Sequence, residues 1–139
     1  MELTANALQT VTADSNVVFT NTTVLGCQSI LHREDSGLVT LRGITCQNRA
    51  RFKVYFGANV ALPTGGTVGP ISLALAINGE PIAATTMIVT PAAVEEFNNV
   101  SRATFVDIPS GCCAQISVRN LTEEDIEVQN ANLIIERVA

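Results

Sequence analysis

Two stretches of the sequence decide the fold: residues 71–88, which read ISLALAINGEPIAATTMI, and residues 114–138, which read AQISVRNLTEEDIEVQNANLIIERV. Each is an alternating apolar and polar run, then a short polar break, then a second alternating run. A period of two places every second side chain on one face of a strand. The first break is Asn78-Gly79, a strong hairpin signal because both residues tolerate a positive φ. Both stretches therefore predict antiparallel hairpins.

Further alternating runs extend this pattern over the rest of the chain. The longest covers residues 50–62, with one expected inner face of Ala50, Phe52, Val54 and Phe56 and one outer face of Arg49, Arg51, Lys53 and Tyr55. The other expected strands are residues 8–12, 17–24, 29–33, 38–42 and 100–108. Turn signals at regular spacing between strands are typical of a sandwich. We predict an all-β, antiparallel jelly-roll β-sandwich, formed by residues 1–139 as a single domain.

Residues 90–99 fit this pattern poorly. Thr90 and Pro91 resemble a helix cap and first helical position, and Glu95 and Glu96 follow closely. A segment this short can equally be an irregular crossover between sheets, so we expect one turn of helix or none.

The composition leaves little charged surface for a monomer. Hydrophobic residues make up 47% of the chain and charged residues 15%, against roughly 25% charged in an average soluble domain. The chain has no Trp, one Tyr and five Phe, which predicts an aliphatic core. We expect the excess apolar surface to be buried between copies of the chain.

Charge and hydropathy exclude several classes of partner. A net charge of −5 argues against nucleic acid. No apolar run is long enough for a membrane span, and the first residues lack the basic and apolar regions of a secretory signal, so we expect neither. Positive residues concentrate in 33–53, whereas acids dominate from Glu80 onward. These are either two solvated faces or a basic and an acidic edge that meet between neighbouring copies.

The end of the chain resembles a known family. The run ISLALAINGEPI, followed by S-V-x-N and N-A-x-L-x-I, resembles the C-terminal jelly roll of collagen-like exosporium glycoproteins and, more broadly, the C1q/TNF-like jelly-roll superfamily. The resemblance covers roughly residues 69–138 and lies in Ser117, Val118, Asn120, Asn130, Ala131, Leu133 and Ile135. It implies a jelly roll assembled as a homotrimer around an apolar axis. Our candidates for the trimer core are Leu73, Leu75, Ile77, Ile116, Val118, Leu133 and Ile135.

The sequence departs from the family in two ways. No Gly-X-Y collagen stalk precedes the domain, and the aromatic residues typical of the mammalian relatives are missing, which argues against receptor binding of their kind. Similar stand-alone trimeric jelly rolls occur as fibre tips and decoration proteins on phage virions.

The four cysteines leave several interpretations open. Cys27 and Cys46 bracket a predicted hairpin and could form a disulfide, worth roughly 3 kcal/mol in the chain-entropy model, or be small buried apolar residues. Cys112 and Cys113 are adjacent, so in a strand they point to opposite faces. They could bond to another subunit, bond to Cys27 or Cys46, or be one buried and one free thiol. Their spacing does not fit structural zinc.

No constellation of residues predicts catalysis or a cofactor. His32 is the only histidine and lies in an alternating strand without a nucleophile motif. Glu95-Glu96 and Glu123-Glu124-Asp125 fit solvated turns better than a glycosidase or calcium site. Gly65-Gly66 lacks the ending of a phosphate loop. Three glycosylation-like triplets, which begin at Asn21, Asn99 and Asn120, are interpreted as chance.

These observations favour a non-enzymatic structural protein without catalytic, metal or cofactor residues. We expect a homotrimer on the exterior of a particle, foremost a phage virion as a capsid decoration or head-fibre protein. The alternatives are a bacterial spore or cell-surface layer, or a fibre tip that binds a carbohydrate or host receptor. Docking to a capsid or surface-layer protein is the expected partnership besides self-association.

Overall fold

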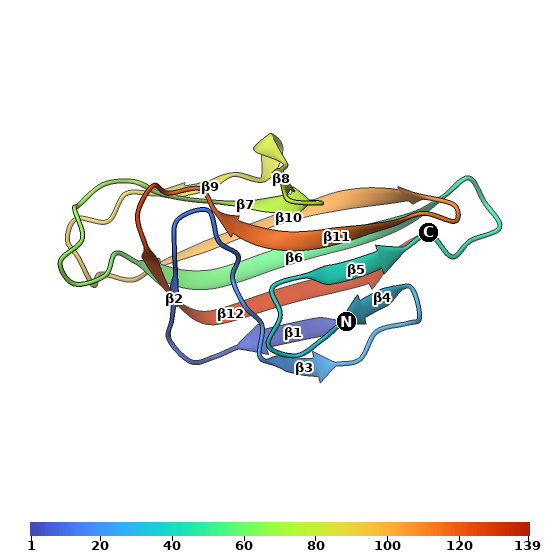
Figure 1. Cartoon of the computed structure of the whole chain (residues 1–139), viewed down its shortest axis with the longest axis horizontal. Coiled ribbons are helices and arrows are strands. Elements are labelled where there is room, and N and C mark those ends of the chain that lie inside the picture. Colours follow the sequence, from blue (N-terminus) through green and yellow to red (C-terminus); the bar gives the residue numbers. More distant parts are fainter.

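The computed structural model describes all 139 residues as two packed antiparallel sheets whose strands run along the long axis of the molecule (Figure 1). The first, which we call the β6 sheet, has the order β10-β6-β12-β1-β3, with β2 also paired to β12. The second, the β11 sheet, has the order β4-β5-β11-β7-β8, with β9 also paired to β7. The strands are β1 (Glu2–Ala5), β2 (Gln9–Val11), β3 (Asn21–Val24), β4 (Ile30–His32), β5 (Val39–Arg42), β6 (Arg49–Ala61), β7 (Ile71–Ile77), β8 (Glu80–Pro81), β9 (Met87–Val89), β10 (Asn98–Pro109), β11 (Cys113–Asn120) and β12 (Ile126–Arg137).

One core of 30 buried apolar residues fills the space between the sheets. The inner face of β6 supplies the predicted set, Ala50, Phe52, Val54 and Phe56, all fully buried. Phe56 meets Phe19 edge to face, with ring centroids 6.3 Å apart. The predicted inner face of this strand is therefore confirmed.

The Asn78-Gly79 turn is confirmed as well. Asn78 has φ of 52° and Gly79 has φ of 84°, and the turn joins β7 to β8 in antiparallel pairing. The Asn78 side-chain carbonyl also accepts a hydrogen bond of 2.9 Å from the Gln115 backbone N–H, which fixes the turn against β11.

The predicted closing hairpin is wrong. β11 pairs with β5 and β7, whereas β12 pairs with β6, β1 and β2, so residues 121–125 cross from one sheet to the other. Both strands alternate because each buries one face in the shared core from opposite sides. Alternation identifies a half-buried strand and does not identify its hydrogen-bonding partner.

Two other segments also differ from the sequence predictions. β1 was not expected. The predicted strand 17–24 divides because Val17 bonds to Val118 of the β11 sheet while Thr20 bonds to Thr4 of the β6 sheet. Residues 90–97 form no helix, in agreement with the expectation of one turn or none, and the one helical element is a 3₁₀ turn, η1 (Ala83–Thr85). The structure contains no helix with the length and apolar character that crossing a membrane requires.

Two asparagines of the S-V-x-N and N-A-x-L-x-I pattern have clear structural roles. Asn120, fully buried at the end of β11, donates through Nδ2 to the carbonyls of Val11, Thr12 and Glu124 at 3.1–3.3 Å. Asn130 adopts a φ of 55° where the pairing of β12 with β6 shifts register, a conformation that asparagine tolerates better than most residues. The pattern therefore marks a buried turn anchor and a β-bulge.

Candidate functional site

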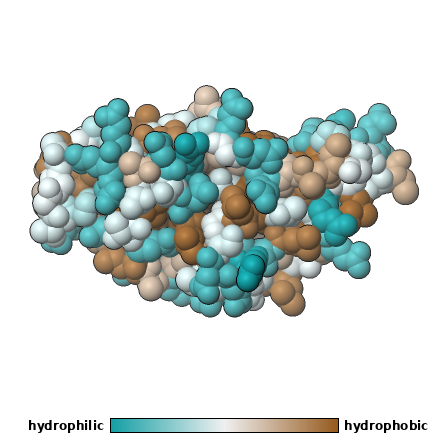
Figure 2. Space-filling model, in the orientation of Figure 1, coloured by the Kyte–Doolittle hydropathy of each residue, from teal (hydrophilic) through white to brown (hydrophobic).

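The outer surface of the β6 sheet is open, whereas that of the β11 sheet is partly covered by its own chain. On the β11 sheet, Ala74 and Ala76 of β7 point away from the core yet are buried. The Arg119 side chain extends from β11 and donates to the Gly79 carbonyl at 2.6 Å. The backbone of Asn16 forms an isolated antiparallel β-bridge with Arg119. On the face seen in Figure 2, apolar side chains reach the surface in scattered patches between polar ones.

We define the open face as the outward residues of the central strands of the β6 sheet: Arg51, Lys53, Tyr55, Gly57 and Asn59 of β6; Asn99, Ser101, Ala103, Phe105 and Asp107 of β10; and Asn132, Ile134 and Glu136 of β12. The antiparallel register arranges these residues in rows across the sheet. Their character changes from charged at one end, through apolar, to amide-rich at the other.

The middle of the open face is apolar. Tyr55 lies opposite Ala103 on one neighbouring strand and Ile134 on the other. Tyr55 is 39% exposed, Ile134 37% and Phe105 62%. Together with Lys53, Glu136 and Ala103, Tyr55 and Ile134 line a shallow hollow of about 240 Å³. This strip is available for contact with another surface.

Tyr55 keeps this part of the face flat. A Cβ atom on Gly57 would lie 3.4 Å from the Tyr55 hydroxyl oxygen and 3.6 Å from its ring. The ring therefore extends along β6 over the glycine backbone instead of projecting into solvent.

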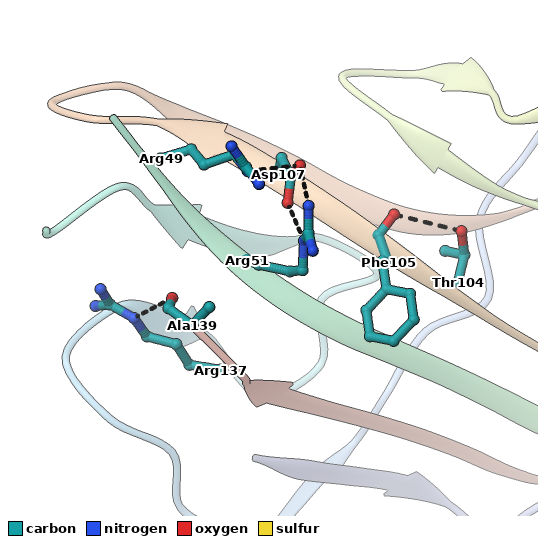
Figure 3. A network of polar contacts seen from close by, with 7 residues as sticks. All are labelled: Arg49, Arg51, Thr104, Phe105, Asp107, Arg137 and Ala139. Atoms are coloured by element: carbon teal, nitrogen blue, oxygen red, sulfur yellow. Dashed lines mark hydrogen bonds and ion pairs between the residues drawn. The ribbon is translucent and has the colours of Figure 1, made fainter. Parts of the chain in front are cut away.

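The charged end of the open face is an arginine–aspartate cluster (Figure 3). Arg51 donates to both oxygens of Asp107, at 2.8 and 3.1 Å, and Arg49 Nε lies 3.0 Å from Asp107 Oδ2. The hydrogen bonds from Arg51 lower the pKa of Asp107, and the same contact raises the pKa of Arg51. One carboxylate therefore binds two guanidinium groups, and the cluster keeps a net positive charge.

The opposite end of the open face is a chain of amides. Asn99 Nδ2 donates to Asn59 Oδ1, and Asn59 Nδ2 donates to Asn130 Oδ1, both at 3.3 Å. These side chains satisfy part of one another's hydrogen-bonding capacity and still offer exposed donors and acceptors.

The residues proposed for the trimer core need correction. Leu73, Leu75, Ile116, Val118, Leu133 and Ile135 are buried between the two sheets of one chain, and Ile77 packs partly against the same core. A second chain cannot contact the six buried side chains in the folded protein. The pattern selected them because inward residues alternate most regularly, whereas the open face is broken by Lys53, Gly57 and Glu136.

The disulfide proposed between Cys27 and Cys46 is absent, and all four cysteines are free and exposed. Cys27 lies in the β3–β4 loop and Cys46 in the β5–β6 loop, outside the paired strands that the prediction relied on. Of the three interpretations of Cys112 and Cys113, one buried and one free thiol is also wrong, because both residues are exposed and Cys112 lies in the turn before β11.

His32 connects two segments near the β4–β5 hairpin. Its Nε2 atom lies 2.9 Å from the Ser36 carbonyl and its Nδ1 atom 3.4 Å from Thr22 Oγ1. Neither contact of His32 is a nucleophile–base pair. No three His, Cys, Asp or Glu side chains converge on a common point that could hold a metal ion.

Solved structures with C1q and TNF names share this fold. Eiger TNF from S. frugiperda aligns with a TM-score of 0.69 and 13% identity over 100% of this chain and 92% of that chain. The globular domain of the zebrafish complement 1qA protein aligns at 0.61 and 12%, over 96% and 93% of the two chains. Murine APRIL aligns at 0.61 and 9%, over 97% of each chain. Neither a protein-family model nor a curated protein matches the sequence.

The chain therefore has the C1q/TNF-like jelly-roll fold, as the resemblance in its second half predicted. The likeness extends to the first half, where the sequence offered only the rhythm of its strands. The sequence analysis did not identify the open face as a contact surface. The available signal was the outer side of β6, where Tyr55 lies among charged residues.

Proposed function

We propose that the protein is a non-enzymatic structural protein that assembles as a homotrimer through the open face. The observation that carries this proposal is the contrast between the two sheets: one outer surface is partly covered by its own chain, and the other leaves Tyr55, Phe105 and Ile134 exposed in adjoining rows. Burial of such a strip between copies removes apolar area from water at roughly 25 cal/mol per Å². The low charged fraction of the chain supports the same assembly.

The proposed setting is the exterior of a particle, foremost a phage virion, where the trimer acts as a capsid decoration or head-fibre protein. A bacterial spore or cell-surface layer is the alternative setting. The support for the virion is that similar stand-alone trimeric jelly rolls occur on phage virions, and the support for the spore surface is the resemblance of residues 69–138 to exosporium jelly rolls. Localisation of the chain by immunogold labelling on purified particles tests the setting, and its absence from every particle surface contradicts it.

A fibre tip that binds carbohydrate is less well supported. Sugar sites commonly stack the ligand on exposed aromatic rings. Tyr55 and Phe105 lie on the open face and become buried in the proposed trimer, which leaves Phe97, 40% exposed, as the remaining exposed aromatic side chain. Binding to a glycan array by the assembled protein would favour the fibre tip over a purely structural role.

The assembly is tested by mass measurement under native conditions at micromolar concentration. We expect three copies. Ile134→Glu places a charge in the apolar strip and should give monomers, whereas Ile88→Glu introduces the same change at an exposed position of the other sheet and should leave the trimer intact. A wild-type monomer, or equal effects of the two variants, overturns the proposed interface.

A further inference from the structure

All four cysteines lie at one end of the sandwich. Cys27 is in the β3–β4 loop, Cys46 in the β5–β6 loop, Cys112 in the β10–β11 turn and Cys113 at the start of β11. These connections lie together at the end that also holds the C-terminus (Figure 1). All four residues are exposed, although unpaired cysteine is among the residue types most often buried. We call residues 25–29, 43–48 and 109–113 the thiol end.

Hydrogen bonds join the three loops into one surface. Gly43 N–H donates to the Cys112 carbonyl at 2.8 Å, and Gly111 N–H donates to the Gly43 carbonyl at 3.0 Å. Arg137 donates to Ser29 Oγ at 3.0 Å and to the Ile44 carbonyl, which connects the first loop to the second. The thiols are therefore presented on one supported surface rather than on independent loops.

The surroundings of the thiol end are positive. Its three segments contain no Asp or Glu. Arg42 pairs directly with Cys113 in the sheet, and Arg49 and Arg51 line a hollow of about 200 Å³ with Gln47, Asn48 and Ala139, next to Cys46. Two carboxyl groups lie nearby and are already bound: Asp107 by Arg49 and Arg51, and the terminal carboxyl group of Ala139 by Arg137 (Figure 3).

The opposite end has the reverse character. Residues 62–70, 90–97 and 121–125, which we call the acidic end, contain Glu95, Glu96, Glu123, Glu124 and Asp125 but no cysteine and no basic residue. If two thiol ends faced each other, their arginines would repel. If a thiol end faced an acidic end, the acidic end would offer no cysteine for a disulfide. End-to-end contact between two copies of the chain therefore does not favour a disulfide between them.

We propose that the thiol end is a covalent attachment site that forms mixed disulfides with an acidic protein carrying an accessible disulfide. A thiolate of the chain attacks one sulfur of that disulfide, so that an S–S bond forms between the two proteins and the partner's original S–S bond breaks. The partner's second sulfur leaves as a thiolate and takes up the proton released by the attacking thiol. No further oxidant is consumed, and the arginines attract the acidic partner.

Small disulfides of opposite charge test this site on the folded protein. We expect oxidised glutathione, an anionic disulfide, to add to the protein roughly tenfold faster than cystamine, a cationic one, at low salt. The preference should fall with added salt and in Arg49→Gln/Arg51→Gln, as followed by intact mass. Peptide mapping should place the adducts on Cys27, Cys46, Cys112 or Cys113.

A matched control moves the thiol to the other end. In a background with all four cysteines changed to serine, Val68→Cys puts one exposed thiol at the acidic end, where cystamine should react faster than oxidised glutathione. The same preference at both ends overturns the charge guidance. A loss of two hydrogen masses without an adduct shows an internal disulfide instead and overturns the attachment site.

Attachment itself is tested on protein from its natural source, with free thiols blocked by N-ethylmaleimide before extraction without reductant. We expect a disulfide-linked species that contains a second, acidic polypeptide bonded to one of the four cysteines. Only unlinked chains, or only multiples of this chain, overturn the proposal. The inference does not rest on the trimer. The two proposals are tested separately, since the serine background should keep the native mass of the assembly.

Discussion

The Tyr55 ring lies over the backbone of Gly57, two residues further along β6, so that a Cβ atom at position 57 would be 3.4 Å from the tyrosine hydroxyl. This contact holds the ring along the open face. A projecting ring would keep two sheets apart, whereas a ring held flat lets another surface approach the strip formed with Ala103 and Ile134.

Substitution of Gly57 tests this arrangement. Gly57→Ile places branched carbon atoms under the ring and should force Tyr55 outward, weakening assembly by about 1–3 kcal/mol, as overpacking does elsewhere. Gly57→Ala adds one atom at ordinary contact distance and should assemble like the wild type. Sedimentation across a concentration series measures both, and equal behaviour of the two variants would show that the Tyr55 orientation is irrelevant to assembly.

The Asn78-Gly79 turn should be sensitive to its second residue. Gly79 has a φ of 84°, and an L-residue with a side chain costs about 1–2 kcal/mol there. Gly79→Val should lower the free energy of unfolding by at least that amount, measured by chemical denaturation. Gly69→Ala is the control and should change stability little, since a Cβ atom on Gly69 would meet open space and Gly69 has no positive φ.

Asn120 should be one of the most sensitive polar positions. Its buried amide donates to the carbonyls of Val11, Thr12 and Glu124. Asn120→Ala would leave these buried acceptors unpaired, which should lower the free energy of unfolding by about 1–3 kcal/mol. Asn48→Ala, at an exposed loop position, should remain within about 0.5 kcal/mol of the wild type. Thermal unfolding of the two variants side by side makes the comparison, and equal melting temperatures would contradict the anchoring role.

The titration of Asp107 should depend on Arg51. The folded-state pKa of Asp107 is lowered from the ordinary value of 3.8, chiefly by the hydrogen bonds from Arg51. The contact therefore contributes to stability above the unfolded-state pKa, and this contribution is lost as the pH falls through the lowered folded-state value. In Arg51→Gln, the Asp107 pKa should move upward when followed by NMR. An unchanged value would show that Arg49 alone holds the carboxylate.

The sequence predicted the secondary structure better than the topology. The inner face of β6 and the Asn78-Gly79 turn could be predicted because both depend on local rules: strand alternation and tolerance of positive φ. The crossing at residues 121–125 could not, because β11 and β12 bury their inner faces in the same core and would alternate identically whether paired or in opposite sheets.

The candidate interface was missed for a related reason. Regular apolar alternation marks the residues that one chain buries for itself, as in Leu73 and Leu133. The surface proposed for assembly mixes apolar with charged and small residues, as Tyr55, Lys53 and Gly57 do. Only the register of three strands brings Ala103, Tyr55 and Ile134 into one row.

The separation of arginines at one end from carboxylates at the other gives the molecule a permanent electric dipole along its length. Near a negatively charged surface, the molecule would rotate before contact, so that its sulfur atoms face that surface. Orientation would then be selected in solution, by long-range forces that salt can screen, ahead of any short-range fit.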